Sequence, residues 1–145
     1  MKTLLSAGMP LVLYAEDDID DATYITKVFA DKKANVNLII VSNGSDAVDY
    51  LKQLGDQKVS LIILDINMPK MDGREALVRI RSMKRFQTVP IILFTTSAME
   101  PDKKFARSYH AEYIRKPAMI HQMDAIVDHF LAICRGEHTM TNSSS

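Results

Sequence analysis

The sequence lacks net charge, a second cysteine and any long hydrophobic run, and each absence excludes a class of protein. Its 18 Lys and Arg residues balance 18 Asp and Glu residues over 145 positions. Without an excess of positive charge, the chain lacks the electrostatic signature of a protein that binds nucleic acid directly through its phosphates. Cys134 is the only cysteine, so no intramolecular disulfide can form and the reducing cytoplasm is the expected compartment.

A membrane segment is also missing. Residues 3–15 are mostly apolar, but Gly8 and Pro10 interrupt them and five acids follow within residues 16–21. This stretch is too short to span a bilayer, and the acids that follow it are not typical of a secretory signal peptide. We therefore expect no membrane association. With 47% apolar residues, the chain can form a single domain around one core, which excludes disorder.

Five short apolar runs predict strands. They are Leu11–Ala15, Val36–Val41, Leu61–Leu64, Ile91–Phe94 and Glu112–Ile114. Three of them, 11–15, 61–64 and 91–94, are apolar at every position, which is typical of central strands that helices cover on both faces. The other two contain polar residues and suit the edges of a sheet.

Helical periodicity separates these runs. Apolar residues recur three or four positions apart in four segments: Ala22, Ile25 and Phe29; Ala47, Leu51 and Leu54; Ala76, Ile80 and Met83; and Ile120, Met123, Val127, Phe130 and Cys134. We expect a further helix over about residues 99–109, and a left-handed helix cap at Gly55. Alternating strands and helices predict one doubly wound α/β domain with a parallel sheet, which binds ligands at the carboxyl ends of its strands.

Polar residues stand at those strand ends. The first strand runs into Glu16, Asp17 and Asp18, the third into Asp65, and Thr95 and Lys116 follow the last two. Each has an ordinary structural explanation when taken alone. Acids such as Asp18, Asp20 and Asp21 can cap a helix and complement its dipole, and for these three that explanation is preferred.

The set as a whole favours a metal-assisted phosphoryl site. Carboxylates held together repel one another unless a cation lies between them, and oxygen ligands select a hard ion such as Mg²⁺. A carboxylate beside the metal can attack a phosphoryl group. Lys116 and Thr95 can then contact the phosphoryl oxygens.

These residues resemble the receiver domain of two-component response regulators. The acidic pair of that family falls on Glu16 and Asp17, with Asp17 as direct metal ligand and Glu16 acting mainly through water. The phosphoacceptor falls on Asp65, and the metal-binding backbone carbonyl falls on Asn67. Pro69 and Gly73 match the loop that follows.

The resemblance assigns the switch residues as well. Thr95 matches the switch hydroxyl, Tyr113 the switch aromatic, and Lys116 the lysine of a Lys-Pro pair whose peptide bond is cis in the family. Asn67 and Ser97 match the two positions that tune dephosphorylation. Thr96 stands where the family usually has a smaller residue, which could narrow the pocket.

The resemblance further implies the flavodoxin-like strand order 2-1-3-4-5 with five helices, over residues 10–135. A histidine kinase or phosphotransfer protein would phosphorylate Asp65 with Mg²⁺, so the chain is expected to be a phosphoacceptor rather than an enzyme. The face formed by the helix at 99–109, the strand at 112–114 and the last helix would then bind an unknown protein target. A second copy could bind the same face.

Residues 136–145 are expected to be a disordered tail, too short for an output domain, so the protein should act through a partner. Residues 70–85 carry six bases against two acids, which we interpret as a solvated face or a docking surface for a kinase or target. Met99, Met119 and Met123 lie near the presumed output face and suit either the core or an adaptable contact surface.

Two alternatives remain open. A degenerate receiver would serve as an interaction module without accepting phosphate, although the complete set of site residues argues against it. An aspartyl-phosphate phosphatase of the haloacid-dehalogenase type would need a second acid two positions after Asp65, where Asn67 stands.

Overall fold

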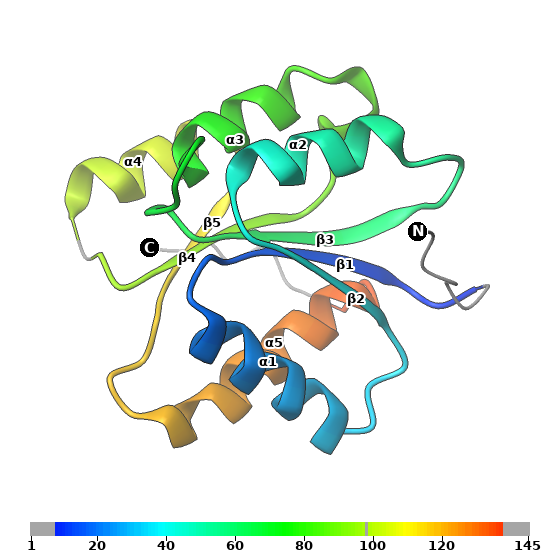
Figure 1. The fold of residues 1–145 in the computed structure, drawn as a ribbon, viewed down its shortest axis with the longest axis vertical. Coiled ribbons are helices and arrows are strands. Elements are labelled where there is room, and N and C mark those ends of the chain that lie inside the picture. Colours follow the sequence, from blue (N-terminus) through cyan, green and yellow to red (C-terminus); the bar gives the residue numbers. More distant parts are fainter. Residues whose placement is uncertain (1–7, 98, 138–145) are drawn as a thin grey trace.

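The computed structural model describes residues 8–97 and 99–137. Its centre is a five-stranded parallel sheet in the order β2-β1-β3-β4-β5 (Figure 1). The strands are β1 (Leu11–Ala15), β2 (Asn37–Val41), β3 (Val59–Leu64), β4 (Ile91–Thr95) and β5 (Glu112–Arg115). The three fully apolar runs are the central strands, and the two runs with polar residues are the edges. The predicted order 2-1-3-4-5 is therefore confirmed.

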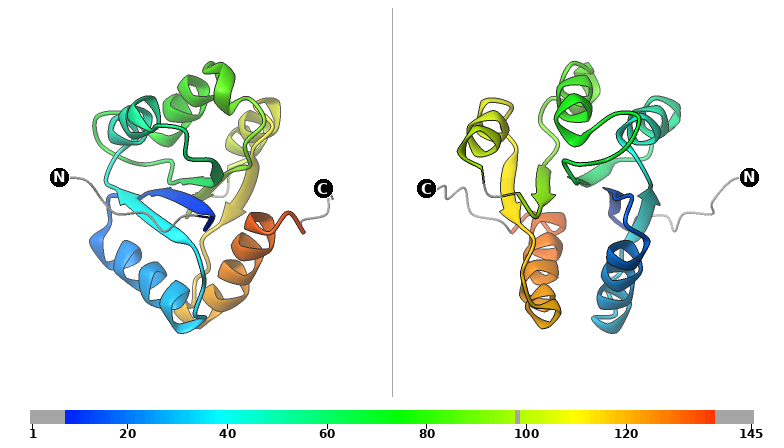
Figure 2. Two further views of the ribbon diagram at one scale, coloured as in Figure 1. Left: turned by 90° about the vertical axis from the view of Figure 1, so that its right-hand side faces the viewer. Right: turned by 60° about the vertical axis from the view of Figure 1, so that its left-hand side comes forward.

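Helices cover both faces of this sheet. The helices α1 (Ile19–Asp31) and α5 (Met123–Cys134) lie on one face, whereas α2 (Gly44–Gln53), α3 (Gly73–Arg81) and α4 (Glu100–Ser108) lie on the other. Figure 2 shows the same two layers from the ends of the strands. Short 3-10 turns at Lys84–Phe86 and Ile120–Gln122 precede β4 and α5. Because both faces are covered, every residue of β1 and β4 is buried.

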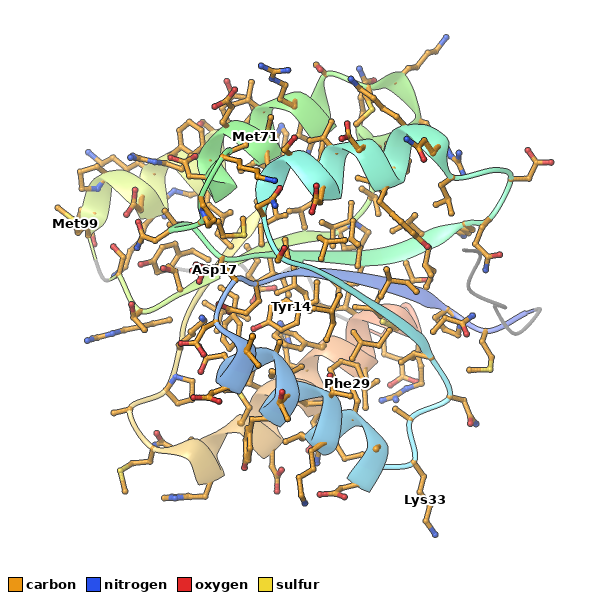
Figure 3. All side chains as sticks on the ribbon, in the orientation of Figure 1. Tyr14, Asp17, Phe29, Lys33, Met71 and Met99 are labelled. Carbon is orange, nitrogen blue, oxygen red and sulfur yellow. The ribbon has the colours of Figure 1, made fainter. Side chains whose placement is uncertain are left out.

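The sheet separates two apolar clusters. Leu13 and Leu93 pack with buried residues of α2 and α3, whereas Tyr14 and Phe94 pack with buried residues of α1 and α5. Neighbouring strand residues belong to different clusters because side chains alternate between the faces of a strand. Figure 3 shows Tyr14 on the α1 side of the sheet, where Phe29 also contributes to the core.

Short polar side chains cap the N-termini of three helices. Asp18 accepts hydrogen bonds from the amides of Asp20 and Asp21 at the start of α1, as expected for a helix cap. In the same way, Asn43 and Asp72 accept a hydrogen bond from a first-turn amide of α2 and α3 respectively.

The left-handed cap predicted at Gly55 is wrong. Helix α2 ends at Gln53, and Leu54 follows in an extended conformation with φ −70° and ψ 130°. The described glycines with positive φ are Gly8 and Gly136. The chain leaves α2 directly into an extended segment, so no left-handed residue is needed there.

No helix in the described part of the chain is long and apolar enough to cross a membrane. All described peptide bonds are trans, so the cis Lys116–Pro117 bond implied by the resemblance is absent from this structure. The trans form is the ordinary preference before proline, by about 0.5–1 kcal/mol. The predicted tail, 136–145, lies outside the described residues except for Gly136 and Glu137.

Candidate functional site

Backbone hydrogen bonds continue the parallel ladder past the strand ends and align the predicted site residues. The Asp65 amide donates to the carbonyl of the last residue of β1 at 3.1 Å. The Lys116 amide donates to the carbonyl of Thr95 at 2.7 Å, and the Glu16 amide donates to the last carbonyl of β2 at 2.9 Å. Each residue is thereby fixed one step beyond its strand. Their side chains meet at the carboxyl end of the sheet, where Figure 3 places Asp17.

The ammonium of Lys116 lies among three carboxylates. Its Nζ atom is 2.6 Å from Glu16, 2.9 Å from Asp21 and 3.3 Å from Asp65. The Lys116 side chain is only 8% exposed. Burial lowers the pKa of Lys116, but the hydrogen bond to Glu16, the charge of Asp65 and the hydrogen bond to Asp21 raise it overall. The lysine therefore remains a buried cation.

Glu16 is the most enclosed carboxylate of the group. Its Oε1 accepts a hydrogen bond from the hydroxyl of Tyr14 at 3.0 Å as well as from Lys116, and its Oε2 accepts one from the amide of Asp18 at 3.1 Å. Burial raises the pKa of Glu16 to about 7; the hydrogen bond from Lys116 opposes this rise and repulsion from Asp65 adds to it. Burial also raises the pKa of Tyr14, so its hydroxyl remains a neutral donor.

The acidic residues are placed where a cation could join them. Carboxylate oxygens of Glu16, Asp17 and Asp65 lie within 4.8 Å of one another. Lys116 contacts Glu16, Asp65 and also Asp21, so this group holds four carboxylates and one ammonium, which leaves three negative charges when all are ionised. An oxygen-only donor set with uncompensated charge fits a hard divalent ion such as Mg²⁺ or Mn²⁺.

The other predicted residues lie at or after the ends of β3 and β4. Thr95 ends β4 and is fully buried, and its Oγ1 accepts a hydrogen bond from the amide of Ser97 at 3.3 Å. Asn67 is exposed in the segment between β3 and α3, and Thr96 is exposed after β4. The structure thus brings Glu16, Asp17, Asp65 and Lys116 into one cluster, and the carbonyl of Thr95 contacts the Lys116 amide.

Tyr113 lies on β5 and is half-buried against the apolar cluster on the α2, α3 and α4 side. Its hydroxyl oxygen is buried and, among the described residues, has no hydrogen-bond partner. The Nζ atom of Lys103 lies 5.9 Å from the centre of the Tyr113 ring. The aromatic side chain is therefore packed inward in this structure.

Four contacts were missed by the sequence analysis. Tyr14 was treated as a core residue, yet its hydroxyl binds Glu16. Asp21 was expected only to complement the helix dipole, but it pairs with Lys116. Asp102 is only 6% exposed and binds Ser97 and Arg74. The contacts of Asp21 with Lys116 and of Asp102 with Arg74 join residues far apart in the chain, so they have no signature in local sequence spacing.

The basic segment 70–85 is also more varied than expected. Arg81 is half-buried, and its guanidinium donates to backbone carbonyls of Tyr109, Phe86, Val89 and His110. Burial lowers the pKa of Arg81. Arg79 is exposed and pairs with Glu75 at 3.0 Å. A solvated face therefore describes Arg79 but not Arg81, which holds neighbouring loops together.

Comparison with known proteins agrees with this geometry. Residues 12–128 match the model of the response regulator receiver domain. The chain belongs to this family. Receiver domains generally act as phosphoacceptors for histidine kinases or phosphotransfer proteins, and they bind Mg²⁺ or Mn²⁺ at an acidic pocket.

Among curated proteins, the response regulator Rcp1 of Synechocystis sp. is 34% identical over 96 residues. The aligned part covers 63% of this chain and 65% of Rcp1, just under two thirds of that relative. The phosphorylated cyanobacterial phytochrome response regulator RcpA has a similar solved structure, with TM-score 0.82, 28% identity, and coverage of 93% of this chain and 100% of RcpA. The Mn²⁺-bound form of Rcp1 gives TM-score 0.79 with 27% identity, covering 92% of this chain and 99% of that structure.

Proposed function

We propose that this protein is a phosphorylation-controlled switch whose phosphoacceptor is Asp65. The observation that carries the proposal is the cluster of Glu16, Asp17 and Asp65, in which Glu16 and Asp65 contact the buried ammonium of Lys116. Similarity to the phosphorylated RcpA structure supports the same conclusion. The protein would accept a phosphoryl group on its own side chain, in the cytoplasm, and would not turn over a substrate.

The transfer needs no general base, because carboxylates as a class attack phosphorus in their ionised form and have no proton to lose. A carboxylate oxygen of Asp65 forms a bond to phosphorus while the bond between phosphorus and the donor histidine nitrogen breaks. The electron pair of that bond stays on the imidazole. Lys116 already contacts Asp65 and is held as a cation, so it can pair with a phosphoryl oxygen. The buried Thr95 hydroxyl would contact another.

Asp17, Asp65 and the backbone carbonyl of Asn67 would bind Mg²⁺ directly. Both carboxylate oxygens of Glu16 already accept hydrogen bonds, which favours a contact through water for this residue. When bound, the ion neutralises negative charge on the carboxylates and on the phosphoryl group. The similarity to the Mn²⁺-bound Rcp1 structure is in line with this role.

Exposed apolar side chains around this end of the sheet offer a surface for a protein donor. Ile19 is 78% exposed, Met99 63% and Met119 55%, and they follow β1, β4 and β5 respectively. Met123 is buried and belongs to the core. A histidine that reaches Asp65 must approach across this rim, so contact with Ile19 and Met119 would orient the kinase or phosphotransfer protein.

The new charge would draw the Thr95 hydroxyl toward the phosphoryl group and shift a pre-existing equilibrium of the chain. Tyr113, whose buried hydroxyl has no hydrogen-bond partner among the described residues, is the aromatic side chain that would respond. The face made by α4, β5 and α5 would then change its affinity for a protein target or for a second copy.

The direct test is incubation of the full chain with acetyl phosphate and Mg²⁺, followed by intact mass measurement. We expect one added phosphoryl group in the wild type and none in Asp65→Asn or after chelation of the metal. Asp56→Asn is the control, because Asp56 is an exposed acid in the segment before β3, at the amino end of the strands and so opposite the site. It should gain phosphoryl like the wild type.

The result also separates the alternatives. A wild type that gains no phosphoryl group from either acetyl phosphate or a phosphorylated histidine donor would contradict the proposal and favour a degenerate receiver. Release of inorganic phosphate from many different phosphate esters, with repeated turnover, would instead favour a phosphatase.

A further inference from the structure

Asp102 is a buried carboxylate outside the acidic cluster, in the first turn of α4. It is 6% exposed. One of its oxygens, Oδ1, lies 3.1 Å from the guanidinium of Arg74 in the first turn of α3. The other, Oδ2, accepts a hydrogen bond from the Ser97 hydroxyl at 2.9 Å. A carboxylate so deeply buried is stable only with such partners, so both contacts hold it in one orientation.

Ser97 connects Asp102 to the proposed phosphoryl pocket. The amide of Ser97 donates to Thr95 Oγ1 at 3.3 Å, and the Ser97 hydroxyl accepts a longer hydrogen bond from the Met99 amide at 3.4 Å. A serine hydroxyl has one hydrogen to donate, and Asp102 receives it. In this arrangement the hydroxyl cannot donate to a water molecule or to a phosphoryl oxygen beside Thr95.

We propose that Asp102 is a positioning residue that holds the Ser97 hydroxyl away from the pocket and so prolongs the lifetime of the phosphoryl group on Asp65. This inference rests on the proposed function. Arg74 supports Asp102 from the other side and fixes its carboxylate. Without Asp102, Ser97 can rotate to another staggered rotamer and offer its hydrogen to a water molecule.

The step concerned is hydrolysis of the aspartyl phosphate. The oxygen of a water molecule forms a bond to phosphorus, and the bond between phosphorus and the Asp65 oxygen breaks. Its electron pair returns to Asp65 as a carboxylate, and phosphate leaves with both hydrogens of the water. A serine hydroxyl is too weak a base to take a proton, but it can orient the attacking water by a hydrogen bond.

The experiment compares the decay of phosphorylated protein after acetyl phosphate is removed, followed by intact mass. Asp102→Ala should lose its phosphoryl group about two to ten times faster than the wild type, the range that one neutral hydrogen bond allows. Asp102→Asn retains an acceptor for Ser97 and should decay at a rate closer to the wild type. Glu100→Ala removes a 69% exposed carboxylate from the same helical turn and should leave decay unchanged.

The double variant separates positioning from a general loss of stability. If Asp102 acts through Ser97, adding Asp102→Ala to Ser97→Ala should not change the decay rate further. An equal acceleration in both backgrounds, or no acceleration in the single variant, would overturn the proposal. If Asp102→Ala is not folded at the assay temperature, Arg74→Met provides the same comparison and should accelerate decay by a smaller factor.

Amide hydrogen exchange tests the hydrogen bond between Ser97 and Asp102 in the unphosphorylated protein. The amides of Ser97 and Met99 should exchange faster in Asp102→Ala than in the wild type and in Glu100→Ala, because the Ser97 side chain that orders them is released. Unchanged exchange in Asp102→Ala would contradict the claim that Asp102 holds the Ser97 side chain. A wild type that gains no phosphoryl group would refute the proposed function, and with it the effect of Asp102 on the lifetime of the phosphoryl group. Faster exchange in Asp102→Ala would still establish that Asp102 holds Ser97. The two failures are therefore distinguishable.

Discussion

The Nζ atom of Lys116 lies 2.6 Å from Oε1 of Glu16, although 100 residues separate the two in sequence. This contact joins the segment after β5 to the segment after β1. In the sheet, the strands β3 and β4 lie between β1 and β5. It supplies a counter-charge inside a cluster of carboxylates that would otherwise repel one another. The same carboxylates remain more negative than one lysine can compensate, which is the physical basis for expecting a divalent ion.

Replacement of this lysine should make the protein depend on the metal for stability. Lys116→Met leaves Glu16 and Asp65 without their common cation, and loss of one partner in a buried ion pair costs about 3 kcal/mol. Mg²⁺ should raise the melting temperature of Lys116→Met more than that of the wild type, because the ion takes over the counter-charge. Thermal denaturation with and without Mg²⁺ measures this difference.

Lys27→Met is the matched control for that prediction. Lys27 is 67% exposed and pairs with Asp31 one helical turn away. Its loss should leave the stability nearly unchanged, with no dependence on Mg²⁺. Equal responses to Mg²⁺ in wild type and Lys116→Met would contradict a shared role of lysine and metal.

Gly73 allows the start of α3 to pass against the backbone of Asp65. A Cβ atom at position 73 would collide with the carbonyl oxygen of Asp65 and lie 2.9 Å from the Cα of Ile66. Backbone atoms cannot rotate away, so Gly73→Ala must displace the phosphoacceptor segment. We expect a loss of about 2 kcal/mol or more in unfolding free energy, and slower phosphorylation of Asp65.

Gly55→Ala provides the comparison, since a Cβ atom there meets nothing within 4 Å. It should keep the stability and the phosphorylation rate of the wild type. Urea denaturation and the acetyl phosphate assay measure the two effects. A Gly73→Ala variant as active and stable as Gly55→Ala would show that the close approach to Asp65 is unimportant.

Arg81 should stabilise the fold although it lies in a basic segment. Its guanidinium donates to four backbone carbonyls, and a lysine has too few donors in the wrong geometry to replace these contacts. Arg81→Lys should therefore lower the unfolding free energy by about 2–3 kcal/mol. Arg79→Lys, at an exposed ion pair, should change it little, and denaturant titration of both variants decides the matter.

The single cysteine should be unreactive in the folded protein. Burial raises the pKa of Cys134 from 9.0 to about 11, while the nearby Arg135 acts in the opposite direction. At pH 8 this shift makes the thiolate about a hundredfold rarer than in an unperturbed thiol.

Iodoacetamide at pH 8 should label the native protein far more slowly than the protein in urea. Because the folded pKa is raised, the contribution of Cys134 to stability is complete below pH 9 and is lost as the pH rises through about 11. Native and denatured protein labelled at the same rate would contradict the burial of this thiol.

The fold could be predicted because the strands carry strong local signals. Leu11–Ala15 is apolar at every position, and the structure has β1 over the same residues. The edge strand β2 begins at Asn37 rather than at the predicted Val36, and β3 begins two residues earlier than predicted, at Val59. Strand ends depend on hydrogen bonds between neighbouring chains, which periodicity does not encode.

The site was predictable where strand ends decide the geometry and unpredictable where helices meet. Glu16, Asp65 and Lys116 follow strands of a parallel sheet, so their proximity follows from topology. The contact of Asp102 with Ser97 depends on where α4 begins, and its contact with Arg74 depends on how α4 packs beside α3. That packing is set by side-chain shape across the whole layer and has no local pattern.

The central claim is that Asp65 carries the phosphoryl group. Borohydride reduces an aspartyl phosphate to homoserine, so treatment of the phosphorylated protein followed by peptide sequencing marks the modified residue. The account predicts homoserine at position 65 alone, dependent on Mg²⁺ and absent when acetyl phosphate is omitted. Homoserine at Asp17, Asp21 or another acid, with an unmodified Asp65, would contradict it.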